Sequence, residues 1–230
     1  ARATLANEFI RQPNAAHKLN KSYNFLTDCL IHTAWMLVTK VLHPLTVPTK
    51  GECLSVLAVG GYGRGEMAPH SDVDLLFLTP YKQTPWSESV IESMLYILWD
   101  LKLKIGHASR TIKECLRLGK DDFTIRTAML EHRHICGDVQ IAQGLEETLW
   151  TDLFCDTANE FIDAKLRERE ARHIKQGGQR YMVEPNVKEG KGGLRDLHSL
   201  FWIAKYVHRV KTTTDLLELS LFSHEEHVIF

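Results

Sequence analysis

Apolar side chains recur at helical spacing between residues 21 and 42, and this pattern predicts a long amphipathic helix. One line along that helix consists of Phe25, Cys29, Thr33, Leu37 and Val41. The helix is expected to end at His43 and Pro44, because proline cannot continue a helical hydrogen-bond ladder.

Shorter apolar runs follow the helix. Residues 53–59 and 73–78 each form a run bounded by turn-forming residues, and they predict two buried strands. Residues 85–99 regain helical spacing, whereas residues 101–108 alternate apolar side chains with lysine, which is the period of a half-buried strand. The first half of the chain therefore predicts the order helix, strand, turn, strand, helix, strand.

Helical spacing dominates from residue 111 onward. Helices are expected at 111–118, 121–135, 140–176 and 193–210, with a break that starts at Gly177 and Gly178 and continues past Pro185. The expected fold class is α+β, in which a small mixed β-sheet with an N-terminal helix precedes a helical part. We expect the first domain at residues 1–135 and the helical domain at residues 136–230.

The end of the chain carries a start signal for one more helix. Ser223 and Glu226 form a capping-box pattern, which predicts a helix from about His224. Because the chain stops soon afterwards, it is interpreted as a fragment of a longer protein.

Composition narrows the class of protein. The chain has 28 Lys and Arg against 29 Asp and Glu, so nucleic acid is not an expected partner. No apolar run approaches the roughly 20 residues of a membrane helix, and no export signal opens the chain, so a cytoplasmic protein without a membrane partner is expected. The five cysteines are odd in number and widely spaced, which predicts reduced thiols without disulfides or structural zinc.

The most informative stretch is residues 59–78, which joins a glycine-rich turn to a strand that opens with Asp72 and Asp74. Side chains at i and i+2 of a strand project to the same face, so the two carboxylates are expected to converge on one point. Paired carboxylates are natural ligands for Mg²⁺, a hard cation that also holds substrate phosphates. We therefore expect Asp72 and Asp74 to be catalytic metal ligands.

The glycine-rich turn supplies candidate phosphate-binding groups. Gly60 and Gly61 let the backbone approach a polyphosphate closely, and Ser71 adds a hydroxyl donor. Arg64 either stabilises the turn or contacts phosphate, and the sequence leaves both roles open. Positioned anions, metals and donors for developing charge are the parts that phosphoryl-type transfer requires.

This arrangement resembles a known superfamily. Gly60-Gly61, followed ten positions later by Ser71-Asp72-Val73-Asp74 and an apolar strand, is similar to the signature of DNA polymerase β type nucleotidyltransferases. The resemblance implies a third carboxylate on a neighbouring strand. Asp100, at the entry to the third predicted strand, is the best-placed candidate for this catalytic role, although it could instead end the preceding helix. Without Asp100, two aspartates are expected to suffice, with His107 or Arg110 lining the same edge.

A second distinctive segment, residues 181–198, is a basic glycine-rich loop that opens onto a helix. Free N–H groups at the helix start, with Lys188, Lys191 and Arg195 nearby, predict an anion site for a triphosphate or pyrophosphate. In the competing interpretation the glycines only permit a tight turn, and Arg195 pairs with a carboxylate.

Three motifs in order narrow the resemblance. These are the Gly60–Glu66 turn, Trp99-Asp100 with the Lys104–His107 run after it, and the Lys191–Leu197 loop. Together they resemble the N-terminal part of the bacterial bifunctional PII uridylyltransferase/uridylyl-removing enzymes, over roughly residues 20–210. The family implies transfer of UMP from UTP to a tyrosine of the PII signalling protein when glutamine is scarce, with release of pyrophosphate.

The resemblance also implies how the parts share the work. Asp72 and Asp74 would ligate two Mg²⁺ ions, one serving the acceptor tyrosine and the other the triphosphate. Family members continue into an HD-type phosphohydrolase domain and two ACT domains that bind glutamine, yet this chain contains no His-Asp dipeptide. Glutamine is therefore expected to act only through domains absent from the chain.

Two other functions stay open on the sequence. One is an adenylyltransferase-type relative that modifies another protein, such as glutamine synthetase, and the other is a non-catalytic nucleotide-sensing module. A further cluster, His132, His134 and Cys136, suggests a metal site at first sight. In a helix those offsets do not share one face, so an ordinary helix end is expected there.

Overall fold

The computed structural model describes residues 1–47, 49, 51–176, 184, 186–210, 212–221, 223 and 225. The chain forms two compact units, Ala1–Trp150 and Thr151–Phe230. This division lies further along the chain than the boundary expected after residue 135, because a fourth strand and the helix after it belong with the sheet.

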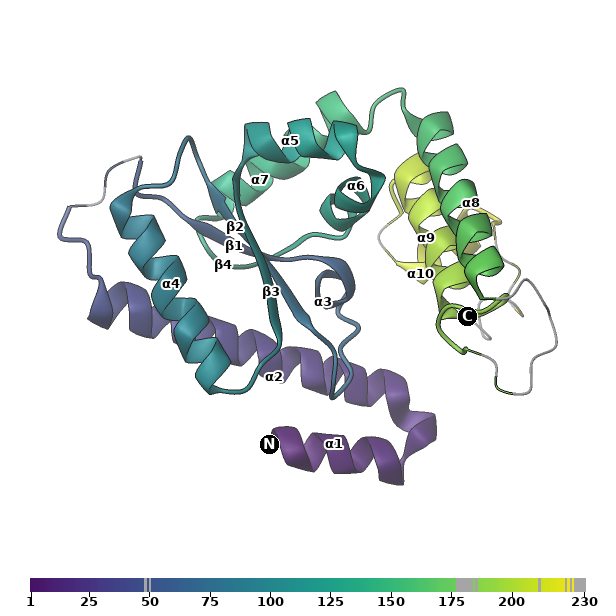
Figure 1. Cartoon of the computed structure of the whole chain (residues 1–230), viewed down its shortest axis with the longest axis horizontal. Helices are drawn as coiled ribbons and strands as arrows, with labels where there is room; N and C mark the ends of the chain where they lie inside the picture. The colour runs from purple at the N-terminus through teal and green to yellow at the C-terminus, as the bar shows by residue number, and fades with distance from the viewer. Residues whose placement is uncertain are drawn as a thin grey trace. The chain divides into compact units, whose positions relative to one another are not determined.

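The first unit is built on a four-stranded sheet in the order β3-β2-β1-β4 (Figure 1). Its strands are β1 (Ser55–Ala58), β2 (Val73–Thr79), β3 (Ile105–Thr111) and β4 (Arg133–Gly137). β1 is antiparallel to β2 and to β4, whereas β2 and β3 are parallel. A parallel pair needs a long crossover connection, and α4 (Pro85–Asp100) supplies it. The mixed sheet and its helices confirm the expected α+β class.

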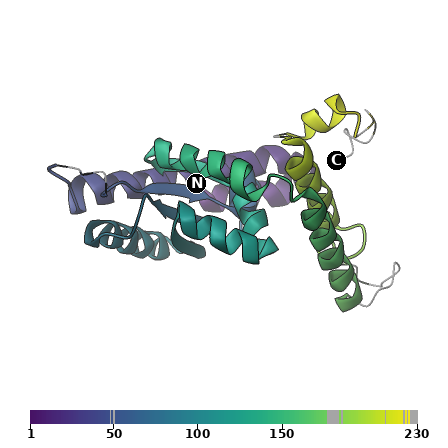
Figure 2. The same cartoon turned by 90° about the horizontal axis from the view of Figure 1, so that it is seen from above.

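Helices cover both faces of the sheet (Figures 1 and 2). On one face, α2 (Ala16–Leu37) and α4 pack against Val73, Leu75 and Phe77 of β2. On the other face lie α5 (Ile112–Asp121), α6 (Phe123–Leu130) and α7 (Val139–Thr148). Successive residues of β2 point to opposite faces of the sheet, and helices cover both faces. β2 is therefore almost wholly buried, and Asp74 is its one partly exposed member.

The N-terminal helix is longer than expected, and its length bears on the expectation that the chain has no membrane-spanning helix. α2 continues into a π-helical turn, Val38–Leu42, and is preceded by α1 (Arg2–Arg11) and a 3₁₀ turn, Pro13–Ala15. By length and composition Ala16–Leu42 is a candidate membrane span, so the expectation that no apolar run approaches that length was wrong. The same test is passed by core helices, and α2 contributes Tyr23 and Ile31 to the buried core.

Two sequence expectations in this unit were wrong for a physical reason. The helix expected at 121–135 ends as α6 at Leu130, and the following residues form β4, whose partner β1 is far away in the sequence. Strand propensity depends on such long-range neighbours, so local spacing did not reveal β4. The third strand begins at Ile105 and not at Leu101, because a turn with Lys102 at a φ of 59° intervenes.

The second unit is helical within the described residues. Its helices are α8 (Ala158–Lys175), α9 (Leu194–His208) and α10 (Thr213–Glu218). The helix expected at 140–176 is interrupted by a π-helical turn, Leu149–Leu153, and by Asp156 at a φ of 56°. The core includes Phe161 stacked on Tyr206, with 4.0 Å between ring centroids. The expected break at Gly177, Gly178 and Pro185, and the expected helix from His224, lie outside the described residues.

Candidate active site

Asp74 is the second residue of β2 and the one member of that strand that is partly exposed. Its backbone carbonyl accepts a hydrogen bond of 3.0 Å from the N–H of Val59, at the end of β1. Its register partner on the parallel strand β3 is Gly106. The Asp74 side chain lies against two glycines, because a Cβ on Gly60 would be 3.5 Å from Oδ2 and a Cβ on Gly106 would be 2.3 Å from Oδ1. Gly106 therefore makes room for this carboxylate, whereas a Cβ at Gly60 would make only an ordinary contact with it.

Asp72 and Asp74 interact electrostatically, as their spacing predicts. Asp72 immediately precedes β2 and is exposed, whereas Asp74 is half-buried. Burial, and then the charge of Asp72, raise the pKa of the Asp74 carboxyl above its ordinary value. Two carboxylates that repel each other at a strand end make a favourable place for a cation. Asp72 and Asp74 are therefore candidate ligands for a divalent metal.

The glycine-rich turn after β1 forms a short helix, α3 (Gly60–Arg64). Gly60 has a φ of +59°, a left-handed conformation that favours glycine. At Gly61 the nearest atoms to a built Cβ are 3.7 Å away, which is an ordinary contact, so the protein itself does not require glycine there. The expected approach of a ligand to Gly61 stays a prediction.

Ser71 stabilises the turn that leads into Asp72. Its hydroxyl oxygen accepts a 3.0 Å hydrogen bond from the N–H of Ala68, and its own N–H donates to the Ala68 carbonyl at 3.0 Å. A hydroxyl that accepts one hydrogen bond keeps its proton as a donor. Ser71 therefore remains able to donate to a phosphate.

Arg64 contacts carboxylates of the protein. Its guanidinium donates to Glu131 Oε2 at 2.6 Å and to Glu66 Oε2 at 2.9 Å. Of the two roles that the sequence left open, these ion pairs favour stabilisation of the turn.

Asp100 does not lie on the sheet. It is the last residue of α4 and is exposed, and β3 starts only at Ile105. The position beside Asp74 on β3 belongs to Gly106, so the expectation that Asp100 sits at the strand entry was wrong. Among the described residues no three His, Cys, Asp or Glu side chains gather in a group that could hold a metal. The role of a third carboxylate therefore stays a prediction.

The two fallback residues on β3 point to opposite faces. Arg110 shares the parity of Gly106 and hence the face of Asp74, whereas His107 has the other parity. His107 instead makes an edge contact with Trp99 of α4, with 6.4 Å between centroids. Of the two, only Arg110 lies on the expected side of the sheet.

The basic loop of the second unit differs from the expected anion site. The N–H of Leu194 donates to the Val187 carbonyl, and the N–H of Arg195 donates to the Lys188 carbonyl, each at 2.9 Å. The sequence analysis expected these N–H groups at the start of α9 to be free, and that expectation was wrong. Arg195 contacts Glu189 at 3.5 Å, as the competing interpretation supposed. Lys188 and Lys191 are exposed, and their predicted contact with phosphate is untested.

Asp196, which the sequence analysis passed over, is the centre of this loop. Its carboxylate accepts hydrogen bonds from the Gly192 N–H at 2.8 Å, from His173 Nε2 at 3.0 Å and from Arg172 Nη2. Burial alone would raise the pKa of this carboxyl, but these donors outweigh burial and lower it. The Gly-Gly-Leu-Arg-Asp motif thus fastens the loop to α8 within the second unit.

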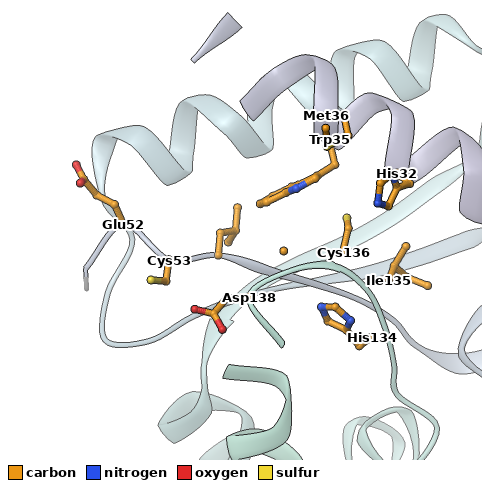
Figure 3. Close-up of a pocket in the computed structure, with 11 residues that line it drawn as sticks. His32, Trp35, Met36, Glu52, Cys53, His134, Ile135, Cys136 and Asp138 are labelled. Atoms are coloured by element: carbon orange, nitrogen blue, oxygen red, sulfur yellow. The ribbon is translucent and has the colours of Figure 1, made fainter. Parts of the chain in front are cut away.

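A separate pocket lies beside β4 and contains none of the predicted site residues (Figure 3). Its volume is about 510 Å³. The lining comes from α2, from the segment before β1, and from β4 with the residue after it: His32, Trp35, Met36, Glu52, Cys53, Leu54, His134, Ile135, Cys136, Gly137 and Asp138. His134 and Cys136 thus lie on a strand beside this pocket, and not at the helix end that the sequence analysis expected.

Comparisons with known proteins agree with the two units. Residues 47–133 match the family described as nucleotidyltransferase domain, and residues 160–229 match the family described as GlnD PII-uridylyltransferase. The chain therefore contains a nucleotidyltransferase domain, a type of enzyme core that generally uses divalent metal ions.

Several curated relatives bear the name bifunctional uridylyltransferase/uridylyl-removing enzyme. The protein of Ruegeria pomeroyi is 62% identical over 229 residues, which is 100% of this chain and 25% of that protein. The proteins of Cereibacter sphaeroides and Caulobacter vibrioides are 59% and 50% identical over 226 residues, each match covering 98% of this chain and 24% of the relative. The chain thus spans about a quarter of the length of the curated relatives it matches.

Proposed function

Because the chain belongs to the family of bifunctional uridylyltransferase/uridylyl-removing enzymes, we propose that it carries their transferase site. The reaction is transfer of UMP from UTP to a tyrosine of the PII signalling protein, with release of pyrophosphate. The names of the relatives and of the family that matches residues 160–229 support uridylyl transfer and PII as the acceptor.

The observation that carries the proposal is the site around Asp74. The Asp72 and Asp74 carboxylates interact at the start of β2, and a Cβ added at Gly60 would lie 3.5 Å from the same Asp74 carboxylate. Two carboxylates that could bind a metal and a glycine-rich turn that could bind phosphate thereby lie at the same end of the sheet. That combination suits a metal-bound nucleoside triphosphate.

Each residue has a task in this reaction. Asp72 and Asp74 would hold the cations, which we propose are Mg²⁺, and the backbone at Gly60 and Gly61 would present N–H donors to the phosphates, with the Ser71 hydroxyl as a further donor. Bound divalent cations supply activation of the acceptor hydroxyl and stabilise the charge that develops on pyrophosphate. The tyrosine oxygen bonds to the α-phosphorus as the bond to the pyrophosphate oxygen breaks, and the hydroxyl proton is lost.

The proposal includes the setting of the reaction. We place the protein in the cytoplasm, where UTP and Mg²⁺ are at hand. We propose that removal of UMP and the response to glutamine belong to parts of such proteins outside the quarter that this chain spans. Within the chain, Asp100, Lys188, Lys191 and Arg195 remain proposed contributors to catalysis or nucleotide binding.

Mass spectrometry of the acceptor protein tests the proposal. The 230-residue chain is incubated with Mg²⁺ and PII protein, with UTP and with ATP in parallel. We expect a UMP adduct on one tyrosine from UTP and none with chelator or with Asp74→Asn. An AMP adduct from ATP would instead favour an adenylyltransferase-type relative, and UTP binding without any adduct would favour a nucleotide-sensing module.

A further inference from the structure

One short segment contacts three consecutive residues of α3. This segment, residues 131–133, follows α6 and ends at the first residue of β4. Arg133 Nη2 donates to the Tyr62 carbonyl at 3.3 Å. A Cβ on Gly63 would lie 1.9 Å from the Glu131 carbonyl oxygen, so the two backbones are in close contact. Arg64 donates to Glu131 Oε2 at 2.6 Å. The far end of the glycine-rich turn is therefore fastened to this segment at every residue.

Burial makes the Arg64–Glu131 pair a fixed contact. The side chain of Glu131 is 2% exposed and that of Arg64 is 11% exposed. Inside a protein a charge-assisted hydrogen bond is stronger than at the surface, and loss of one partner leaves a buried charge behind. Glu66, the other carboxylate on Arg64, has a side chain that is 50% exposed and lies in the turn region itself. Glu131 is thus the anchor that ties the turn to the body of the domain.

α2 supplies a second anchor for the same turn. Asp28 accepts a 2.7 Å hydrogen bond from the Tyr62 hydroxyl, and both terminal nitrogens of Arg133 donate to it at 2.9 and 3.0 Å. Burial and the Asp28 carboxylate raise the pKa of Tyr62, so the hydroxyl keeps its proton and remains a donor. Asp28 and Arg133 form a bidentate pair, which fixes direction as well as distance.

The near end of the turn is where the proposed phosphate donors lie. Gly60 opens α3 close to the Asp74 carboxylate, since a Cβ added there would lie 3.5 Å from Oδ2. A shift of the turn would therefore move the Gly60 and Gly61 N–H groups relative to Asp74. A misplacement of about 1 Å in a binding group is enough to cost up to about a hundredfold in rate.

We propose that Glu131 is a positioning residue for nucleotide binding, acting through Arg64 to hold the turn in register with Asp72 and Asp74. This inference rests on the proposed function. Asp28 and Arg133 support the same turn through Tyr62. The Glu131 side chain bonds to Arg64 behind the turn, and it acts on the bound phosphates only through the backbone it holds.

Two binding measurements on the 230-residue chain separate this role from a merely structural one. UTP affinity in Mg²⁺ is measured by calorimetry without acceptor protein, and Mn²⁺ affinity is measured without nucleotide. For Glu131→Ala we expect UTP binding to weaken at least about tenfold, while Mn²⁺ binding and the circular dichroism of the fold stay as in the wild type.

Two further variants serve as matched comparisons. Glu131→Gln keeps an acceptor oxygen for Arg64 but loses the charge of the ion pair, so it is expected to recover only part of the UTP affinity. Glu66→Ala removes only the exposed partner and is expected to change UTP affinity by less than about threefold. Both are expected to fold, so the comparison stands even if the alanine variant is unstable.

The outcomes are distinct. If Glu131→Ala binds UTP as the wild type does, or if Mn²⁺ and UTP binding fall together with the melting temperature, the positioning role is overturned. If the alanine variant does not fold, a Glu131→Gln chain that binds Mn²⁺ as the wild type does but binds UTP several-fold more weakly supports the role. Full wild-type UTP affinity in Glu131→Gln then contradicts it. A wild-type chain that binds no nucleotide overturns the proposed function itself, and this inference with it.

Discussion

The Asp74 carboxylate lies directly against the α-carbon of Gly106 on the neighbouring strand, so a methyl group at Gly106 would come within 2.3 Å of Asp74 Oδ1. Gly106→Ala is therefore expected to turn the carboxylate away from its present position. The backbone at Gly106 has no positive φ, so the fold should tolerate alanine. We expect the rate of nucleotidyl transfer to fall by about a hundredfold, measured at saturating UTP.

Gly144→Ala is the matched control for the added methyl group. Gly144 lies within α7, and a Cβ there would make an ordinary 3.6 Å contact with Ile112 Cδ1. This variant is expected to keep full activity and to gain about 0.5–1 kcal/mol in the free energy of unfolding. Full activity in Gly106→Ala would show that the Asp74 position is unimportant for transfer.

Gly61→Ala tests whether the turn approaches a ligand at Gly61. The nearest atoms to a built Cβ belong to Arg64 and Glu66, each at 3.7 Å, so the protein accommodates it. We expect the melting temperature to stay within about 2 °C of the wild type while UTP affinity falls about tenfold. Calorimetric titration with UTP measures the second effect, and unchanged affinity would remove Gly61 from the phosphate site.

Asp74→Asn is expected to stabilise the metal-free protein. Burial and Asp72 raise the pKa of Asp74 in the folded state, so the ionised carboxylate destabilises the fold at neutral pH, and this effect is relieved as pH falls toward that raised pKa. An uncharged asparagine should raise the melting temperature at pH 7 in chelator by about 1–3 °C. A scan that shows a lower melting temperature would contradict the assignment of Asp74 as a strained, functional carboxylate.

Asp196→Asn is expected to have the opposite effect. The lowered pKa of Asp196 means that its carboxylate stabilises the folded state above about pH 4, and that this contribution is lost as pH falls through the lowered value. Replacement removes the charge on the bonds from Arg172 and His173 and should cost about 1–3 kcal/mol at pH 7. The difference from wild type in urea unfolding should shrink toward pH 3.

Glu218→Gln is a suitable control for that series. Glu218 ends α10 in the same unit and is exposed, so its charge should matter little. A difference between wild type and Asp196→Asn that stays constant from pH 7 to pH 3 would mean that the carboxylate charge does not hold the loop.

The sequence predicted the parts of the site that are local. Asp74 lies on β2 and Asp72 is the residue just before that strand, so local spacing was enough to predict that their carboxylates interact. The glycines at 60 and 61 follow β1 directly, which is also a local relation. Spacing thus predicted α2, β1, β2 and α4, whereas α1 was not predicted and the glycine-rich segment, expected as a turn, forms the short helix α3.

What the sequence missed depends on contacts between distant residues. Glu131 and Asp28 have no local signature, because their partners Arg64 and Arg133 come from other elements. Gly106 carried a usable signal, since an isolated glycine in a strand often marks a close approach of another group. Asp100 was expected at a strand entry because the turn at Lys102 is not visible in the alternation of leucine and lysine.

The most direct test of the central claim, that Asp72 and Asp74 hold the metals of a nucleotidyl-transfer site, is the stoichiometry of Mn²⁺ bound in the presence of a non-hydrolysable UTP analogue. Electron paramagnetic resonance of free Mn²⁺ measures it for the wild type, for Asp72→Asn and Asp74→Asn, and for Asp100→Asn. We expect about two ions per wild-type chain and loss of at least one ion in Asp72→Asn and Asp74→Asn. Loss of an ion in Asp100→Asn would support Asp100 as the third carboxylate, and wild-type stoichiometry would remove it from that role. Wild-type stoichiometry in both Asp72→Asn and Asp74→Asn would contradict the account.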